Sequence, residues 1–253
     1  MKIMLLGTGA AEWNKPDASG AIRRFSSALL EGRLLIDIPA TALELLPEDN
    51  CISDVIITHG HGDHFNLEAL RKLALMRKMK GAEPICVHVE EGWAEHVSGE
   101  HICVKPFGVL EEFEAAGFTL VPLPANHIPT FPGEKPIHYR ITDGEKTLVY
   151  ATDGAWMPYP AVHALSERDP FAAWVSDTTI GAGQEGDYRV FEHNSLPMVR
   201  IMVDTFLATG NMKKEGTVYL THMARTLHPP RDVLEASLEA PYVAAYDGMI
   251  AEI

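Results

Sequence analysis

Short apolar runs, separated by glycine-containing turns and polar segments, dominate the first quarter of the chain. Runs at residues 2–6, 26–30 and 33–37 predict strands, and a tight Glu-Gly turn joins the last two. The next run, at 55–57, is short, β-branched and bounded by polar residues. This pattern is typical of a buried strand whose carboxyl end opens into a functional site.

Strands and helices are interspersed through the rest of the chain. Further strands are predicted at 85–89, 118–123, 137–141, 147–151, 174–177 and 218–221, with short C-terminal strands around 247–248. Helices are predicted just after His64, near 90–97, from Ser195 to Gly210 and at 230–239. No repeat or linker interrupts the pattern, so we expect a single domain over residues 1–253 with two face-to-face sheets and helices outside.

The composition agrees with an ordinary globular domain. With 253 residues and 46% hydrophobic content, the chain can bury a full core. It has no stretch of about 18 apolar residues and no signal-peptide pattern, so we expect no membrane span and a cytoplasmic location. Its three cysteines, Cys51, Cys86 and Cys103, are far apart, which predicts buried small apolar residues rather than disulfides or metal ligands.

The charge narrows the choice of partners. A net charge of −14 argues against a nucleic-acid-binding protein, since phosphate contacts need clustered Lys and Arg. The helix after His64 carries five basic residues opposite an apolar stripe of Leu67, Leu70, Leu73, Ala74 and Met76. This arrangement favours a solvated outer face over a surface for an anionic substrate. A homodimer is the default expectation for the oligomeric state.

Residues 58–64, Thr-His-Gly-His-Gly-Asp-His, contain the densest candidate chemistry. His59 and His61 point to one side of an extended chain, and the two glycines let the backbone turn so that Asp63 and His64 reach the same region. Imidazole nitrogen with carboxylate oxygen suits zinc-like divalent metals. A solvated histidine-rich loop, or a helix capped by Asp63, is the alternative.

The order His-x-His-x-Asp-His after a hydrophobic strand resembles the signature of metallo-β-lactamase-fold hydrolases. The resemblance implies an α/β (α+β) fold, the four-layer αβ/βα sandwich. His127, Asp153 and His222 each follow a predicted strand and match the remaining ligands of that family in type and order. By resemblance, one metal is held by His59, His61 and His127, the second by Asp63, His64 and His222, and Asp153 bridges both.

Asp37 ends an otherwise apolar strand, where its carboxylate is either an ordinary turn group or the partner of a metal-bound imidazole N–H. The family resemblance favours the second role. Two divalent ions about 3.5–4 Å apart would share and activate a bridging water, so hydrolysis is the expected chemistry, with Asp63 also a candidate catalytic residue. The ligand types suit zinc and manganese.

His193 opens the helix that is capped at Ser195, at a position where a phosphodiesterase branch of the family carries a non-ligand His. Segments such as Pro-Leu-Pro-Ala-Asn-His at 122–127 and Tyr-Asp-Gly-Met at 246–249 resemble the phosphoribosyl 1,2-cyclic phosphate phosphodiesterases of phosphonate metabolism. This resemblance implies that His193 binds phosphate or acts as a general acid on a small or cyclic phosphate ester. Simple helix capping is the alternative for His193.

The chain departs from that branch in two places. Residues 10–25 contain no cysteine, and Arg225 stands where a His would help to hold a structural zinc, so we expect this additional zinc to be absent. Arg225 is then either a contact for an anionic substrate or a surface ion pair. A lactone or carboxylic ester hydrolase is the second functional hypothesis; an RNA-processing nuclease and a non-catalytic metal-binding protein are further alternatives.

Overall fold

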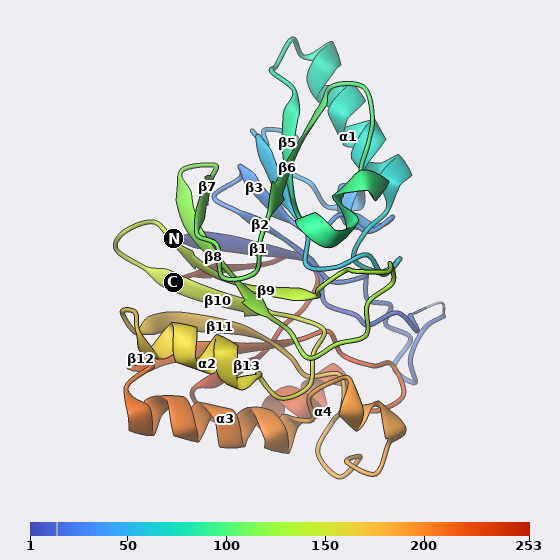
Figure 1. The fold of residues 1–253 in the computed structure, drawn as a ribbon. Coiled ribbons are helices and arrows are strands. Elements are labelled where there is room, and N and C mark those ends of the chain that lie inside the picture. Colours follow the sequence, from blue (N-terminus) through green and yellow to red (C-terminus); the bar gives the residue numbers. More distant parts are fainter. Residues whose placement is uncertain (14) are drawn as a thin grey trace.

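Two seven-stranded mixed sheets face each other in the computed structural model, which describes residues 1–13 and 15–253 (Figure 1). In spatial order, the first sheet contains β14 (Met249–Glu252), β1 (Lys2–Gly7), β2 (Ser27–Leu30), β3 (Leu34–Ile36), β4 (Asp54–Ile56), β5 (Ile85–Glu90) and β6 (Ile102–Phe107). The second contains β13 (Tyr242–Ala244), β12 (Met212–Thr221), β11 (Phe171–Asp177), β10 (Thr147–Ala151), β9 (Ile137–Thr142), β8 (Phe118–Pro124) and β7 (Phe113–Ala115).

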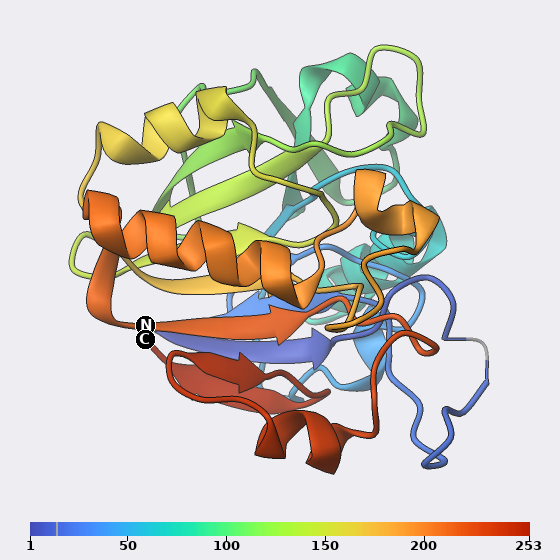
Figure 2. The ribbon, with the colours of Figure 1, turned by 90° about the horizontal axis from the view of Figure 1, so that it is seen from below.

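Helices lie outside the sheets and complete four layers. The α-helices are α1 (Leu67–Met79), α2 (Tyr159–Ser166), α3 (Leu196–Thr209) and α4 (Arg231–Ala236), and η1 (Ala42–Glu44), η2 (Glu91–His96) and η3 (Tyr188–Phe191) are short 3₁₀ helices. Helix α1 packs on the first sheet, while α2 and α3 cover the outer face of the second (Figure 2). The predicted α/β sandwich is therefore confirmed.

Three apolar clusters hold these layers together. The central one joins the facing sides of the two sheets, for example Leu30 and Ile36 with Leu120 and Tyr139. A second packs α2 and α3 on the second sheet, and a third packs α1 on the first. Since burial of apolar area is the main favourable term in folding, each sheet is stabilised from both faces.

Most predicted elements are present, with differences where the local pattern is weak. The strands β6 and β7 and the helix α2 were not expected: β6 contains exposed Lys105 and Pro106, and α2 spans only 8 residues. The helix predicted near 90–97 is present as the 3₁₀ helix η2, and the last helix is shorter than predicted. Short elements depend on tertiary packing more than on their own periodicity.

Two predictions about exposure are wrong. Met76 is 39% exposed although the predicted stripe on α1 included it, while Leu70, Leu73 and Ala74 are buried. None of the three cysteines is buried, and Cys51 is exposed. Within the described ranges, no helix is long and apolar enough to cross a membrane.

Candidate metal centre

The carboxyl ends of strands from both sheets meet at one edge of the sandwich. Strands β3, β4 and β5 pair in parallel in the first sheet, and β10, β11 and β12 pair in parallel in the second. Parallel strands end on the same side, so the residues that follow them lie close together. These positions hold the seven predicted metal ligands: His59, His61, Asp63 and His64 after β4, His127 after β8, Asp153 after β10 and His222 after β12.

Asp153 lies at the centre of this cluster. Its Oδ2 is 3.1 Å from His59 Nε2, 3.2 Å from His64 Nε2, 3.3 Å from His127 Nε2, 3.7 Å from His222 Nε2 and 4.0 Å from His61 Nδ1. Five imidazole nitrogens therefore converge on one buried carboxylate oxygen. Such a convergence is what a carboxylate shared between metal ions requires.

The seven predicted ligands form two groups that share Asp153, and a further group that shares it adds Asp177 and His193 to His222. His59, His61 and His127 form one of the two with it, and Asp63, His64 and His222 form the other, the same division that the resemblance implied. Within the groups, His61 Nδ1 lies 3.1 Å from His127 Nε2, and His64 Nε2 lies 3.2 Å from His222 Nε2.

The missing hydrogen-bond partner of one buried nitrogen indicates whether a cation would suit this cluster. His59 Nε2 makes no hydrogen bond to any described residue although it faces Asp153. A buried polar atom without a hydrogen-bond partner lowers the stability of the folded protein. A cation between His59 Nε2 and the Asp153 carboxylate would provide such a partner. Nitrogen and oxygen donors in this mixture suit a divalent metal.

Two carboxylates behind the cluster orient its histidines. Asp37, as expected, lies 2.7 Å from His64 Nδ1, and it also accepts a 2.7 Å hydrogen bond from the backbone N–H of Thr58. Asp177, which the sequence analysis did not single out, lies 3.3 Å from His222 Nδ1. Carboxylates of this kind fix the orientation of a ligating ring and raise its basicity.

Three residues of the site have left-handed backbone conformations. Asp37, Asp153 and His222 have φ values of 59°, 61° and 54°, and each lies one or two residues beyond the end of its strand. At each of these positions the chain leaves its strand, and the side chain lies in or directly beside the cluster. The left-handed conformation costs about 1–3 kcal/mol for a residue with a β-carbon, although Asp and His tolerate it better than most residues.

The pKa values of the cluster show opposing influences. Burial lowers the pKa of His127 to about 3, so this imidazole is neutral near pH 7, the form that binds metal. Burial also disfavours the charged form of His222, but Asp153 and Asp177 outweigh it and raise the pKa to about 9. The carboxylates thus attract positive charge into a buried site, which favours a bound cation.

His193 lies beside the cluster, at the amino end of α3. Its Nδ1 is 2.9 Å from Asp153 Oδ1 and 3.1 Å from Asp177 Oδ2. The helix cap is Ser195, whose side chain accepts a hydrogen bond from the N–H of Met198, so the capping alternative for His193 is wrong. Burial lowers the pKa of His193, but the two carboxylates outweigh it and raise the pKa to about 11.

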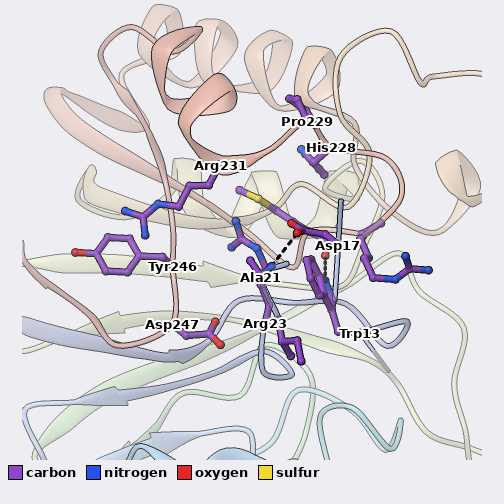
Figure 3. Close-up of a pocket in the computed structure, with 13 residues that line it drawn as sticks. Trp13, Asp17, Ala21, Arg23, His228, Pro229, Arg231, Tyr246 and Asp247 are labelled. Carbon is purple, nitrogen blue, oxygen red and sulfur yellow. Dashed lines mark hydrogen bonds between the residues drawn. The ribbon is translucent and has the colours of Figure 1, made fainter. Parts of the chain in front are cut away.

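A pocket of about 290 Å³ opens over these residues. It is lined by Ala10, Ala11, Glu12, His61, Asp63, His127, Asp153, Thr179, Tyr188, Arg189, Glu192, His193 and His222. Arg225 instead lines another cavity, of about 210 Å³. Figure 3 shows this cavity with Arg23 and Arg231, which also line it. This placement does not favour contact between Arg225 and a substrate at the metal ligands.

Glu134 supports the loop that carries the first two histidines. Its buried carboxylate accepts hydrogen bonds from the N–H groups of Gly60, Thr130 and Phe131. Its importance was not visible in the sequence, because the bond to Gly60 joins residues 74 positions apart.

Glu134→Gln is expected to destabilise the protein by about 1–3 kcal/mol, because the amide NH₂ must face one of these donors. We expect metal affinity to fall by about 10–100-fold, because Gly60 lies between His59 and His61. Urea unfolding and metal titration measure the two effects, with the exposed Glu239→Gln as a control. Unchanged metal affinity would show that Glu134 does not contribute to metal binding.

Residues 36–223 match the family model described as a beta-lactamase superfamily domain, a range that contains all seven predicted ligands and Asp37. A comparison with curated protein sequences finds no match.

Solved structures match nearly the whole chain at low identity. A diphosphatase from the PhnP family is 18% identical, with a TM-score of 0.73, over 99% of this chain and 97% of that one. The metallo-beta-lactamase fold protein YhfI from Bacillus subtilis is 19% identical, with a TM-score of 0.74, over 99% of both chains. The short form of human tRNase Z is 18% identical, with a TM-score of 0.68, over 100% of this chain and 99% of that one. The predicted metallo-β-lactamase fold is thus confirmed.

Proposed function

This chain belongs to the beta-lactamase superfamily of metal-dependent hydrolases, and we propose that it is a dinuclear phosphodiesterase acting on a small or cyclic phosphate ester. The observation that carries the proposal is the sharing of Asp153 by two groups of ligand atoms that border one pocket. Zinc and manganese both suit these donors. When bound, such ions supply an activated water and neutralise charge in the transition state.

His193 is the residue that favours a phosphate ester over a carboxylic ester. Asp153 and Asp177 hold its Nδ1, which leaves Nε2 as the ring nitrogen for a substrate. From the edge of the pocket, an N–H at that position can donate a hydrogen bond to a phosphoryl oxygen or give its proton to the leaving oxygen. Hydrolysis of an activated lactone has less need of such a donor.

One structural neighbour and the net charge support a small substrate. One structural neighbour is a diphosphatase, and another, tRNase Z, acts on an RNA. The net charge of −14 disfavours an RNA, because binding the phosphate backbone needs clustered positive charge.

Removal of metal is expected to abolish hydrolysis of bis(p-nitrophenyl) phosphate, because the ligand set provides no other activated nucleophile. Zinc or manganese added to the dialysed protein should restore turnover, with about two ions bound per chain. Elemental analysis measures the number of bound ions, and release of nitrophenolate measures turnover. A parallel assay with an acyl lactone tests the second hypothesis: lactone turnover without phosphodiester turnover would overturn the proposal. Metal uptake without any turnover would indicate a binding protein.

A further inference from the structure

Another cavity lies at the edge of the second sheet that is opposite to the metal centre. It has a volume of about 910 Å³ and is lined by Thr147 at the start of β10, Asp169 just before β11 and Lys213 near the start of β12. The other ends of these three strands lead to residues of the metal centre. An extended chain rises about 3.3 Å per residue, so Thr147 and Asp153 lie roughly 15–20 Å apart. The cavity is therefore separate from the pocket over the metal ligands.

The wall of this cavity contains a buried arginine without an ion-pair partner. Arg140, on β9, is only 7% exposed. Its Nη2 donates two long hydrogen bonds, each of 3.4 Å, to Thr147 Oγ1 and to the carbonyl oxygen of Asp169. Its Nε is buried and makes no hydrogen bond to any residue that the structure describes. A guanidinium has five N–H groups, so most of the hydrogen-bonding capacity of Arg140 is unused.

The charge of Arg140 is only partly compensated by its surroundings. Burial lowers the pKa of Arg140, the charge of Arg168 adds to this effect, and Asp169 and Glu112 offset it only in part. The guanidinium is still charged at neutral pH, because the ordinary pKa of arginine is very high. A buried charge with few hydrogen bonds and no counter-ion lowers the stability of the fold. A bound anion would supply both the counter-charge and the missing acceptors.

The other groups that line the cavity select a small anion. Arg168 and Lys213 add positive charge, and the buried hydroxyl of Thr147 accepts from Arg140 and keeps its own hydrogen for another acceptor. The acidic residues of the cavity are all exposed: Glu112, Glu145, Glu167 and Asp169. They would repel a polyanion at the entrance, whereas a small ion can reach Arg140. We propose that this cavity binds a small oxyanion, such as a sulfate, a phosphate or a carboxylate, through Arg140 and Thr147. The proposal does not depend on the phosphodiesterase activity.

Calorimetric titration of sulfate into the metal-loaded protein tests the proposal. Arg140→Gln should weaken sulfate binding by about 10–100-fold, because charge-assisted hydrogen bonds are lost. Thr147→Val keeps the shape of the side chain and removes the hydroxyl, so it should weaken binding by about 2–10-fold. Lys80→Gln, at an exposed position at the end of α1, is the control and should bind sulfate like the wild-type protein. A parallel titration with acetate shows whether a tetrahedral or a planar oxyanion is preferred.

Asp153→Asn separates this cavity from the metal centre, because sulfate is also a ligand for metal ions. This variant alters the metal centre and leaves Arg140 in place, so sulfate binding at the cavity should be unchanged. Sulfate binding that is lost in Asp153→Asn and kept in Arg140→Gln would place the anion at the metal ions and overturn the proposal. Absence of sulfate and acetate binding to the wild-type protein would overturn it as well.

Thermal unfolding of Arg140→Met gives an independent test. In chloride, this variant should unfold at the wild-type temperature or above it, because an uncompensated buried charge is removed. Sulfate at about 100 times its dissociation constant, compared with chloride at equal ionic strength, should raise the midpoint by about 5–10 °C for the wild-type protein. The rise for Arg140→Met should be less than about 2 °C, from the general effect of the salt. Equal rises would overturn the proposal. If Arg140→Met does not fold, Thr147→Val decides, and unchanged sulfate binding in that variant would overturn the proposal.

Discussion

Asp153→Asn is expected to reduce bound metal from about two ions to fewer than about one per chain and to lower phosphodiester turnover by at least about 10³-fold. Both groups of ligand atoms share this carboxylate, and its Oδ2 lies within 4.0 Å of five imidazole nitrogens. An amide offers one neutral oxygen, and its NH₂ would point toward ligand atoms that also need a cation. The change therefore affects both ions at once.

Elemental analysis and nitrophenolate release from bis(p-nitrophenyl) phosphate measure this effect on the same preparation. Asp204→Asn, on the exposed side of α3, is the matched control and should retain full metal content and turnover. Near-normal metal content in Asp153→Asn would show that the two groups do not depend on a shared ligand, and the dinuclear proposal would be wrong.

His193→Ala is expected to lower phosphodiester turnover by about 10²–10⁴-fold while metal content stays unchanged. The imidazole lies beside Asp153 and Asp177 at the pocket, and its ligand atom is also close to that of His222. We expect unchanged metal content because His193 is not one of the seven residues proposed to hold the two ions. A general acid matters most when the leaving oxygen is basic. The loss should therefore be larger for a methyl diester than for a p-nitrophenyl diester, whose leaving group departs without a proton.

The pattern of losses assigns the role of His193. Equal losses on both leaving groups would indicate binding of a phosphoryl oxygen instead of proton donation. Unchanged turnover would remove the basis for preferring a phosphate ester over a lactone. His163→Ala, at an exposed position on α2, is the control for loss of an imidazole elsewhere.

The residues of the two candidate ligand groups could be picked out in the sequence because each has a local signal. His59, His61 and His64 stand in one motif, and Asp153 and His222 follow recognisable apolar strands. Asp177 carries the same signal as Asp37, a carboxylate at the end of an apolar strand, and could have been found by the same reasoning.

Other parts of the site depend on partners far away in the sequence. Glu134 contacts Gly60 across 74 positions, and Arg189 contacts Glu12 across 177, so neither interaction leaves a periodic or spaced pattern. Arg225 shows the opposite case: it is close to His222 in the sequence, yet it lines a different cavity. The edge strand β6 and the helix α2 were missed because their packing, and not their composition, determines them.

The positive φ angles of Asp37, Asp153 and His222 bear on how this protein can evolve. Glycine adopts each of these conformations at a lower conformational free energy. Substitutions that raise thermostability can therefore remove side chains of the site while the fold stays intact. A laboratory screen for heat resistance alone would tend to enrich inactive variants altered at these three positions.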